Sequence, residues 1–397
     1  MDIFVGVVVG LLVLMTLVVL HELGHFIAAR RNGVRVLEFG IGFPPKAIAW
    51  VKNPKTKKWQ RLPRSEWKNP QDGLIFSLNW LPIGGFCQMD GESAADERPG
   101  TFGRANFWKK TKILFAGVLM NWLTAIVIFT VLAWTGMPEF LDGQFTIPVD
   151  TRTESVPVEI SSVAEDSPAS RAGLKEGDKI LAVDGHKFLH ASEITDYNEE
   201  HADEEVTYTI ERGEILEKNI KLNPAGSEYL LGVTMATSQA LSYSTWSAPI
   251  VGLGLTAQLT GETFRGVGIM LWDLVSGAVS QLSPDANVRE SGKEAISAVG
   301  DSVSGPVGIV GVLFPAFTAA GPNNLAFLAA LISVSLACMN VLPIPALDGG
   351  RWLLIAIYKL RKKKLTKEKE EKIVSRAFLA LLILILIVTI LDITRFF

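Results

Sequence analysis

The sequence contains little cysteine and no run of charge at either end. Its two cysteines, Cys87 and Cys338, stand in unrelated segments, so we expect no disulfide framework and interpret both as small apolar residues. There is no acidic tail, and the one dense basic run lies between two apolar segments. These absences argue against a disulfide-stapled secreted domain and predict no nucleic-acid partner.

The N-terminus also lacks the basic stretch with which a cleavable signal peptide begins. Met1 and Asp2 precede an uncharged apolar run over residues 3–20, and no small-residue cleavage site ends it. The apolar character continues to Ala29, and a bilayer is spanned by about 20 helical residues. We therefore predict that residues 3–29 form a retained membrane span.

The remaining composition is too apolar for an ordinary soluble domain. Of the 397 residues 48% are hydrophobic, the formal net charge is −3 and the mean hydropathy is +0.29. Further stretches that can span a bilayer are residues 113–134, 325–342 and 377–393. The composition thus predicts an α-helical membrane protein with four transmembrane helices and a water-soluble module.

The basic residues set the expected orientation of these spans. Lysines and arginines are concentrated over residues 30–112 and 359–376, and such loops usually face the cytoplasm. Residues 136–324 and both termini would then face outward. We therefore expect a multi-pass membrane protein with the lipid bilayer as a partner.

Three other segments differ from the spans. Residues 74–89 are apolar, too short to cross and interrupted by Pro82, so they favour a membrane-associated β segment. Residues 155–225 are polar, with turn signals and an alternating stretch at 206–210, which indicates a small soluble αβ domain. Residues 246–280 are apolar but contain three charged side chains, which favours an interfacial amphipathic helix over a span.

The motif His21-Glu22-Leu23-Gly24-His25 is the strongest chemical signal. On a helix, residues four apart lie on one face, so both imidazoles point at one place. Two histidines with an adjacent glutamate predict a catalytic Zn²⁺ site in which Glu22 acts as the general base. Ionisable groups at the end of an apolar span are costly and are usually functional.

A third metal ligand must come from elsewhere in the chain. The remaining histidines all lie in the predicted soluble domain, and the pair His186 and His190 reads as surface residues. The candidates are carboxylates beside apolar segments, namely Glu262, Asp273, Asp348 and Asp392. Prolines before Asp348 and glycines after it would turn its carboxylate back toward the bilayer.

The direction of the spans restricts this choice. His21 and His25 lie near the inner end of an inward-running span, and Asp348 follows the end of a later span. These ends meet only if both spans run the same way, which requires one crossing between them, supplied by residues 113–134. Either residues 246–274 do not cross the membrane or Asp348 is not the ligand.

The pairing of this histidine motif with Asn340-Val-Leu-Pro-Ile-Pro-Ala-Leu-Asp348-Gly-Gly resembles the site-2 protease family of intramembrane zinc proteases. Within that family the chain looks most like bacterial membrane proteases that carry outward-facing PDZ domains and cleave anti-sigma factors. This resemblance implies location in the bacterial cytoplasmic (inner) membrane, with the active site near the cytoplasmic face. Residues 39–46, 81–86 and 304–309 also resemble that family, and residues 167–181 resemble the PDZ domains of bacterial proteases. One PDZ-like copy is found.

The resemblance implies a role for each matching residue. His21, His25 and Asp348 would bind zinc and Glu22 would be the base. The tentative substrate-binding residues, for some of which an interhelical hydrogen bond is the alternative, are Asn340, Asn121, Gly84, Gly85 and Phe86. The implied domains are residues 1–135 with the motif and the β loop, a PDZ-like domain at 150–235, an amphipathic or interfacial segment at 240–320, and the last two spans at 321–397.

The expected function is zinc-dependent hydrolysis of single-span membrane proteins, such as anti-sigma factors or signal-peptide remnants, in regulated intramembrane proteolysis. A peptide bound by the PDZ-like domain is a further possible partner. One alternative is a membrane zinc transporter or sensor, although a transporter needs polar groups at several depths. Another is an inactive scaffold, although no ligand and no base is missing.

Overall fold

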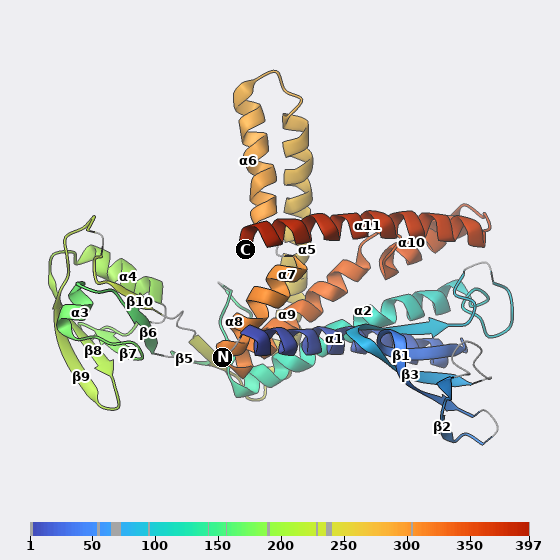
Figure 1. Cartoon of the computed structure of the whole chain (residues 1–397), viewed down its shortest axis with the longest axis horizontal. Helices are drawn as coiled ribbons and strands as arrows, with labels where there is room; N and C mark the ends of the chain where they lie inside the picture. The colour runs from blue at the N-terminus through green and yellow to red at the C-terminus, as the bar shows by residue number, and fades with distance from the viewer. Residues whose placement is uncertain are drawn as a thin grey trace. The chain divides into compact units, whose positions relative to one another are not determined.

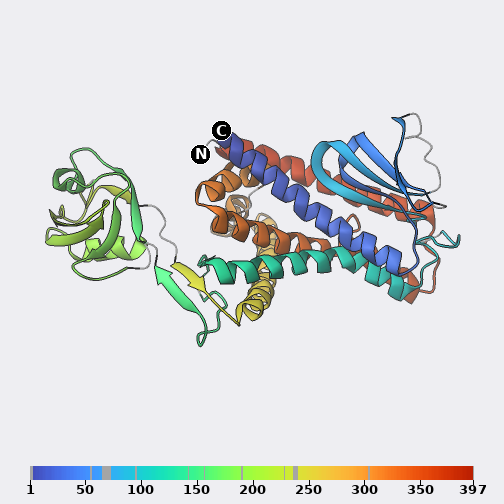
Figure 2. The same cartoon turned by 90° about the horizontal axis from the view of Figure 1, so that it is seen from below.

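The computed structural model describes residues 3–53, 56–64, 73–93, 96–141, 143–155, 157–188, 191–227, 229–235, 240–302 and 305–396. The chain divides into two compact units, drawn from two directions in Figures 1 and 2. Residues 1–129 and 252–397 form the first, here called the helical unit, and residues 130–251 form the second, here called the strand-rich unit.

Among the residues described above, four helices are long and apolar enough to cross a membrane, as the sequence predicts. They are α1 (Ile3–Arg31), α2 (Phe107–Thr135), α9 (Pro322–Val341) and α11 (Lys367–Phe396), the last apolar up to Thr394. In Figure 2 the N-terminus and the C-terminus lie at the same end of the helical unit. Among the described residues this fits an even number of alternating crossings.

In the described part of the chain, the segment from residue 244 to α9 adds no fifth helix of this kind. Its helices are α5 (Ala248–Ser280), α6 (Ala286–Ser302), α7 (Pro306–Gly308), the π-helical turn η2 (Ile309–Leu313) and α8 (Phe314–Ala319). In Figure 1 α5 and α6 stand side by side and crosswise to α1 and α11. The interfacial position predicted for residues 246–280 stays a prediction.

A β-sheet packs along the second half of α1. It contains β1 (Val36–Lys52), β2 (Trp59–Arg61) and β3 (Leu74–Met89). The β-structure predicted over residues 74–89 is confirmed with those bounds. Strand β1 was not predicted, because its alternation of buried and exposed residues is broken near Gly42.

The register shows that β1 and β3 are two interlocked hairpins. The first half of β1 pairs with both halves of β3, since Glu38 is opposite both Gln88 and Ile75. The second half of β1 pairs with the first half of β3, from Lys46 opposite Asn79 to Lys52 opposite Leu74. Both strands therefore turn back at the same end of the sheet, which is here called the tip. The opposite end of the sheet is here called the base.

The strand-rich unit holds a five-stranded sheet of order β10-β6-β7-β8-β9 and a three-stranded sheet of order β4-β11-β5. Its elements are β4 (Met137–Pro138), β5 (Arg152–Ser155), β6 (Val158–Val163), α3 (Pro168–Ala172), β7 (Lys179–Val183), α4 (Ala191–Glu200), β8 (Glu205–Glu211), β9 (Ile215–Lys221), β10 (Val233–Met235) and β11 (Ala240–Tyr243).

This unit has a core of its own. Ile160, Tyr208 and Ile210 are fully buried in a cluster of apolar side chains between the five-stranded sheet and its helices. The Ser167 hydroxyl caps α3 by accepting a hydrogen bond from the Ser170 amide. The predicted small αβ domain therefore exists as a packed unit, and its PDZ-like character stays a prediction.

Candidate metal centre

The two motif histidines lie on one face of α1, as their spacing requires. Their ring centroids are 4.8 Å apart, and His21 and His25 are only 8% and 6% exposed. The residues before them are uncharged and apolar, so both imidazoles belong to a helix that is long and apolar enough to cross a membrane.

Asp348 reaches the same place from the other end of the chain. Helix α9 ends at Val341, and α10 (Asp348–Leu360) begins at the aspartate after a short turn that holds Pro343 and Pro345. A Cβ atom on Gly349 would collide with the carbonyl of Val341 at the end of α9, and one on Gly350 with the carbonyl of Ile344 in the turn. This turn therefore needs both glycines, as the sequence indicates.

Three potential ligand atoms form an equilateral triangle. The Nε2 atoms of His21 and His25 are 3.2 Å apart, and each is 3.2 Å from Oδ2 of Asp348. Ligands about 2.0–2.1 Å from a tetrahedral zinc ion are separated by about 3.3 Å. Among the described residues, this is the one group of three metal-ligand side chains.

The hydrogen bonds behind His25 fix which of its nitrogens faces the triangle. Its Nδ1 atom lies 2.8 Å from the carbonyl oxygen of Ile113, which can only accept, so Nδ1 carries the proton. The Nε2 lone pair is then directed at Oδ2 of Asp348, a buried atom that makes no regular hydrogen bond. Converging lone pairs repel one another unless a cation lies between them, so the residues fit zinc.

Asn121 fixes which nitrogen of His21 faces the ligand triangle, as the Ile113 carbonyl does for His25. Its side-chain nitrogen is placed 3.2 Å from Nδ1 of His21, while its oxygen is buried without a partner. Amide nitrogen and oxygen are interchangeable in such an assignment. Turning the amide lets Oδ1 accept from Nδ1–H and leaves Nε2 free for a metal. Asn121 is 1% exposed, which favours the interhelical bond over substrate contact.

Two glycines allow α1 and α2 to touch at the centre. A Cβ atom on Gly117 would lie 2.6 Å from Nε2 of His25 and 2.6 Å from Cε1 of His21. A Cβ atom on Gly24 would collide with the carbonyl of Ala116. Sequence reasoning identified neither glycine as part of the site, since a glycine within an apolar helix shows no local pattern.

Glu22, the predicted general base, contacts the β-sheet that packs along α1. The carboxylate of Glu22 accepts a hydrogen bond from the backbone N–H of Cys87 in β3. Gly85 lies against α1, where an added Cβ atom would be 3.2 Å from Val19. The second half of β3 thus runs beside the motif and holds the Glu22 carboxylate in place.

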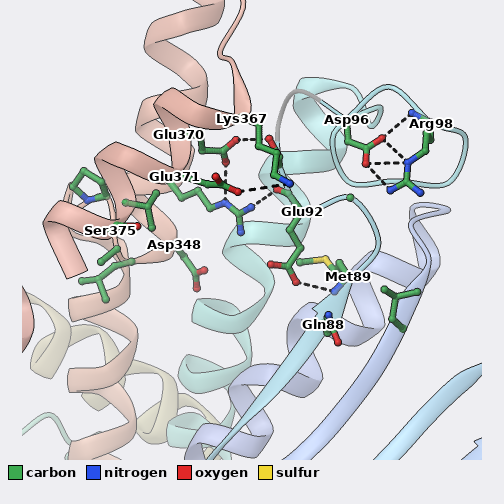
Figure 3. A pocket seen from close by; sticks show the side chains of 18 residues that line it. Gln88, Met89, Glu92, Asp96, Arg98, Asp348, Lys367, Glu370, Glu371 and Ser375 are labelled. Atoms are coloured by element: carbon green, nitrogen blue, oxygen red, sulfur yellow. Dashed lines mark hydrogen bonds and ion pairs between the residues drawn. The ribbon is translucent and has the colours of Figure 1, made fainter. Parts of the chain in front are cut away.

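A cavity of about 780 Å³ adjoins Asp348 (Figure 3). Its walls come from the loop after β3, the start of α10 and the start of α11, and the labelled side chains are mostly polar. At its rim the Arg98 guanidinium holds the pKa of Asp96 below its usual range by donating hydrogen bonds. The cavity gives the ligand set a polar approach.

A buried charge cluster joins the cavity walls. The Arg351 Nε atom is 3.5 Å from Oε1 of Glu370, whose other oxygen accepts from Ser93. The guanidinium also lies over the buried ring of Phe102 at 5.1 Å, and the ammonium of Lys110 approaches that ring at 5.6 Å. The sequence did not reveal this cluster because its members come from four separate segments.

The other candidate residues lie elsewhere. The amide of Asn340 donates to the carbonyl of Leu336 in its own helix. Gly84, with φ +73°, and Phe86 belong to the sheet near its tip. Asp392 accepts from the amides of Gly305 and Gly308.

Of the remaining sequence candidates, Glu262 pairs loosely with Arg265, 3.7 Å away, and Asp273 joins no metal-ligand group in the described chain. His186 is exposed, whereas His190 and Ser304 fall outside the described residues. Cys87 and Cys338 are buried and free, as expected.

Comparison with known proteins gives one family. The model of peptidase family M50 matches residues 9–385. A Clostridium perfringens relative is 29% identical over 98% of each chain. The zinc metalloprotease RasP of Geobacillus kaustophilus is 26% identical over 96% of each chain.

Two further similarities bear on the finer predictions. The regulator of sigma-W protease RasP of Bacillus subtilis is 25% identical over 99% of this chain and 100% of its own. A PDZ domain of an SdrC-like protein from Listeria monocytogenes is 27% identical over 20% of this chain and 87% of that domain, with a TM-score of 0.19. That score is too low to support a fold assignment.

Proposed function

The chain belongs to peptidase family M50 and is a membrane zinc metalloprotease, and we propose that it cuts single-span membrane proteins at the centre formed by His21, Glu22, His25 and Asp348. The observation that supports this most directly is the triangle of three ligand atoms, each 3.2 Å from the other two. The two histidines of this triangle lie toward the C-terminal end of α1, a helix long enough to span a bilayer.

The two histidines and Asp348 would hold the zinc ion, and Asn121 and the Ile113 carbonyl would hold the imidazoles in the tautomer that binds it. When bound, zinc polarises the scissile carbonyl and lowers the pKa of water to about 7. The ligand set carries one negative charge, which leaves the site a net positive charge for this purpose.

Glu22 would move the proton. Its carboxylate follows His21 in sequence and is oriented by the Cys87 amide. It would accept a proton from the attacking water and return it to the nitrogen of the leaving amine. Breaking the peptide bond thus consumes one water and needs no other reactant.

A transmembrane substrate must unwind before it is cut, because a helix hides its amides in hydrogen bonds. Among the described residues, β3 pairs only with β1, which leaves the outer side of its second half available beside Glu22. We propose that an unwound stretch of substrate adds there as a strand. Gly84, Gly85 and Phe86 would shape the entry to that edge.

The orientation follows from charge. Arg30 and Arg31 end α1, and Lys109, Lys110 and Lys112 begin α2, so these ends would face the cytoplasm of a bacterium. The strand-rich unit would lie outside. Anti-sigma factors are the proposed substrate class, on the ground that the Bacillus subtilis relative is named a regulator of sigma-W protease.

The test is Glu22→Gln in the full-length protein with a candidate single-span substrate. We expect cleavage to fall below detection while zinc content, measured by elemental analysis, stays at one ion per chain. His25→Ala should lose the zinc as well. Undiminished cleavage by Glu22→Gln would show that another residue is the base.

A further inference from the structure

The base of the β-sheet carries an unusual concentration of positive charge. Residues 39–65 contain seven lysines and arginines and no aspartate or glutamate. Lys46 is neutralised within the sheet by Glu38, 2.7 Å away. Of the others, Lys52, Lys57 and Lys58 lie toward the base, where β1, β2 and the end of α1 come together.

A pocket of about 410 Å³ lies at this base. It is lined by Arg30, Lys52, Asn53, Lys57, Gly73 and Leu74. Of the described residues that line this small space, three are cations and none is acidic. In the described chain Arg30, Lys52 and Lys57 have no acidic partner, although Arg30 and Lys52 lie over the rings of Phe26 and Trp59 at 5.5 and 5.7 Å.

The depth of the pocket follows from α1. At the tip of the sheet, Gly84 lies near Val18, whereas the pocket is lined by Arg30, twelve residues further along the helix. With a rise of 1.5 Å per residue, the tip lies about 18 Å deeper along the span than the pocket.

Side-chain character changes along the sheet in the same direction. At the tip Phe43, Trp80 and Leu81 are 45%, 69% and 49% exposed, which suits hydrocarbon. At the base Trp50 and Trp59 are 40% and 46% exposed, and tryptophan is typical of the headgroup level. The pocket therefore lies where phosphate groups of the bilayer would be.

We propose that this pocket binds the phosphate of an anionic phospholipid from the cytoplasmic leaflet. Arg30 and the two lysines supply the countercharge, and the Asn53 amide supplies a neutral donor. Gly73 keeps the space open, since its φ is +155° and a Cβ atom there would meet Val51 and the carbonyl of Lys52. A bound lipid would hold the sheet, and with it β3, at a fixed depth.

The test uses the full-length protein in detergent, titrated with phosphatidylglycerol or phosphatidylcholine, with native mass spectrometry counting bound lipids. We expect one phosphatidylglycerol to bind preferentially. The variant Arg30→Gln/Lys52→Gln/Lys57→Gln should bind it on the order of tenfold to a hundredfold more weakly. Zinc content of the variant checks that the helical unit remains folded.

The matched control is Arg361→Gln/Lys362→Gln/Lys363→Gln, which removes the same charge from an exposed basic turn. It should keep the tight lipid. Equal weakening by both triple variants would show diffuse surface attraction and overturn the pocket. If the first variant does not fold, Arg30→Gln and Lys57→Gln are tested singly, each expected to weaken binding about fivefold.

Excess inorganic phosphate separates a lipid from a soluble ligand. Displacement of phosphatidylglycerol by a low concentration of phosphate would assign the pocket to a soluble anion. That outcome would overturn the proposal of a lipid site. Equal binding of phosphatidylcholine would show that the acyl chains alone are recognised, and would overturn it too. None of these outcomes depends on proteolysis.

Discussion

Gly117 of α2 lies so close to His25 of α1 that an added Cβ atom would be 2.6 Å from the imidazole Nε2 atom. That nitrogen is one corner of the ligand triangle, so the missing side chain of Gly117 is part of the centre. The close approach also explains how the Ile113 carbonyl, one turn earlier on α2, reaches Nδ1 of the same ring.

Gly117→Ala should therefore expel the metal. The methyl group would push His21 and His25 away from Asp348, at a cost of about 1–3 kcal/mol for overpacking. We expect zinc content well below one ion per chain by elemental analysis. Gly261→Ala is the control, because a Cβ atom there meets nothing within 4 Å. A Gly117→Ala protein with full zinc would contradict the proposed geometry.

Asn121→Ala should weaken zinc binding about 10–100-fold, since removing a partner of a ligating histidine has that effect. Asn121→Asp keeps an acceptor for Nδ1–H of His21 and should restore much of the affinity. Competition with a fluorescent chelator measures both. Ser333→Ala, which removes only a bond to the Asn121 backbone, is the control. A substrate-binding role would instead raise KM at unchanged zinc affinity.

These two predictions show what the sequence could and could not supply. The histidine spacing leads from the residues to His21, Glu22 and His25. The residues alone leave Asp348 as one of four carboxylate candidates, and the resemblance to the site-2 protease family singles it out. Composition indicates β-structure over residues 74–89, because that apolar run is too short to cross a membrane and is interrupted by Pro82. Gly117, the Cys87 amide and β1 were not predicted, because their roles depend on contacts between distant segments and leave no local periodicity.

Arg351 and Glu370, which lie in the wall of the cavity beside Asp348, should stabilise one another. Glu370→Gln leaves Arg351 and Lys110 near one another without a countercharge, so we expect a loss of about 1–3 kcal/mol in stability. Arg351→Gln strands a carboxylate that is 6% exposed. The double variant should be less destabilised than the sum of the single ones, by more than about 0.5 kcal/mol. Thermal unfolding of all four proteins gives the coupling, and strict additivity would mean no interaction.

The strand-rich unit should respond to acid through Asp178. Hydrogen bonds from the Arg212 guanidinium lower the pKa of this carboxyl group, so ionised Asp178 stabilises the fold. That contribution is present above the unfolded pKa of about 3.9 and is lost as pH falls through the lower folded value.

Asp178→Asn should therefore be less stable than the native protein at pH 7, and the gap should narrow below about pH 4. Limited proteolysis of residues 157–235 at several pH values measures this. Asp203→Asn is the control, because its ion pair with Lys221 is largely exposed. A gap that widened on acidification would reverse the assigned sign.

Removal of the five-stranded sheet separates two uses of the strand-rich unit. The ladder between β5 and β11 ends with Ser155 opposite Ala240, so the chain enters and leaves that sheet through adjacent residues. Replacing residues 156–239 by Asn-Gly should close a two-residue hairpin there and leave the β4-β11-β5 sheet intact. Zinc content and membrane insertion then check that the remainder is folded.

If the removed part excludes substrates with large outer domains, the shortened protein should cut both intact and trimmed single-span substrates. If the removed part instead recruits trimmed substrates by binding their ends, the shortened protein should cut trimmed substrates more slowly, with a higher KM at unchanged kcat. We favour exclusion, because a folded body joined at adjacent residues is bulky whatever peptide it binds. Unchanged rates on trimmed substrates together with no cutting of intact ones would rule out both uses, and the unit would then need another role.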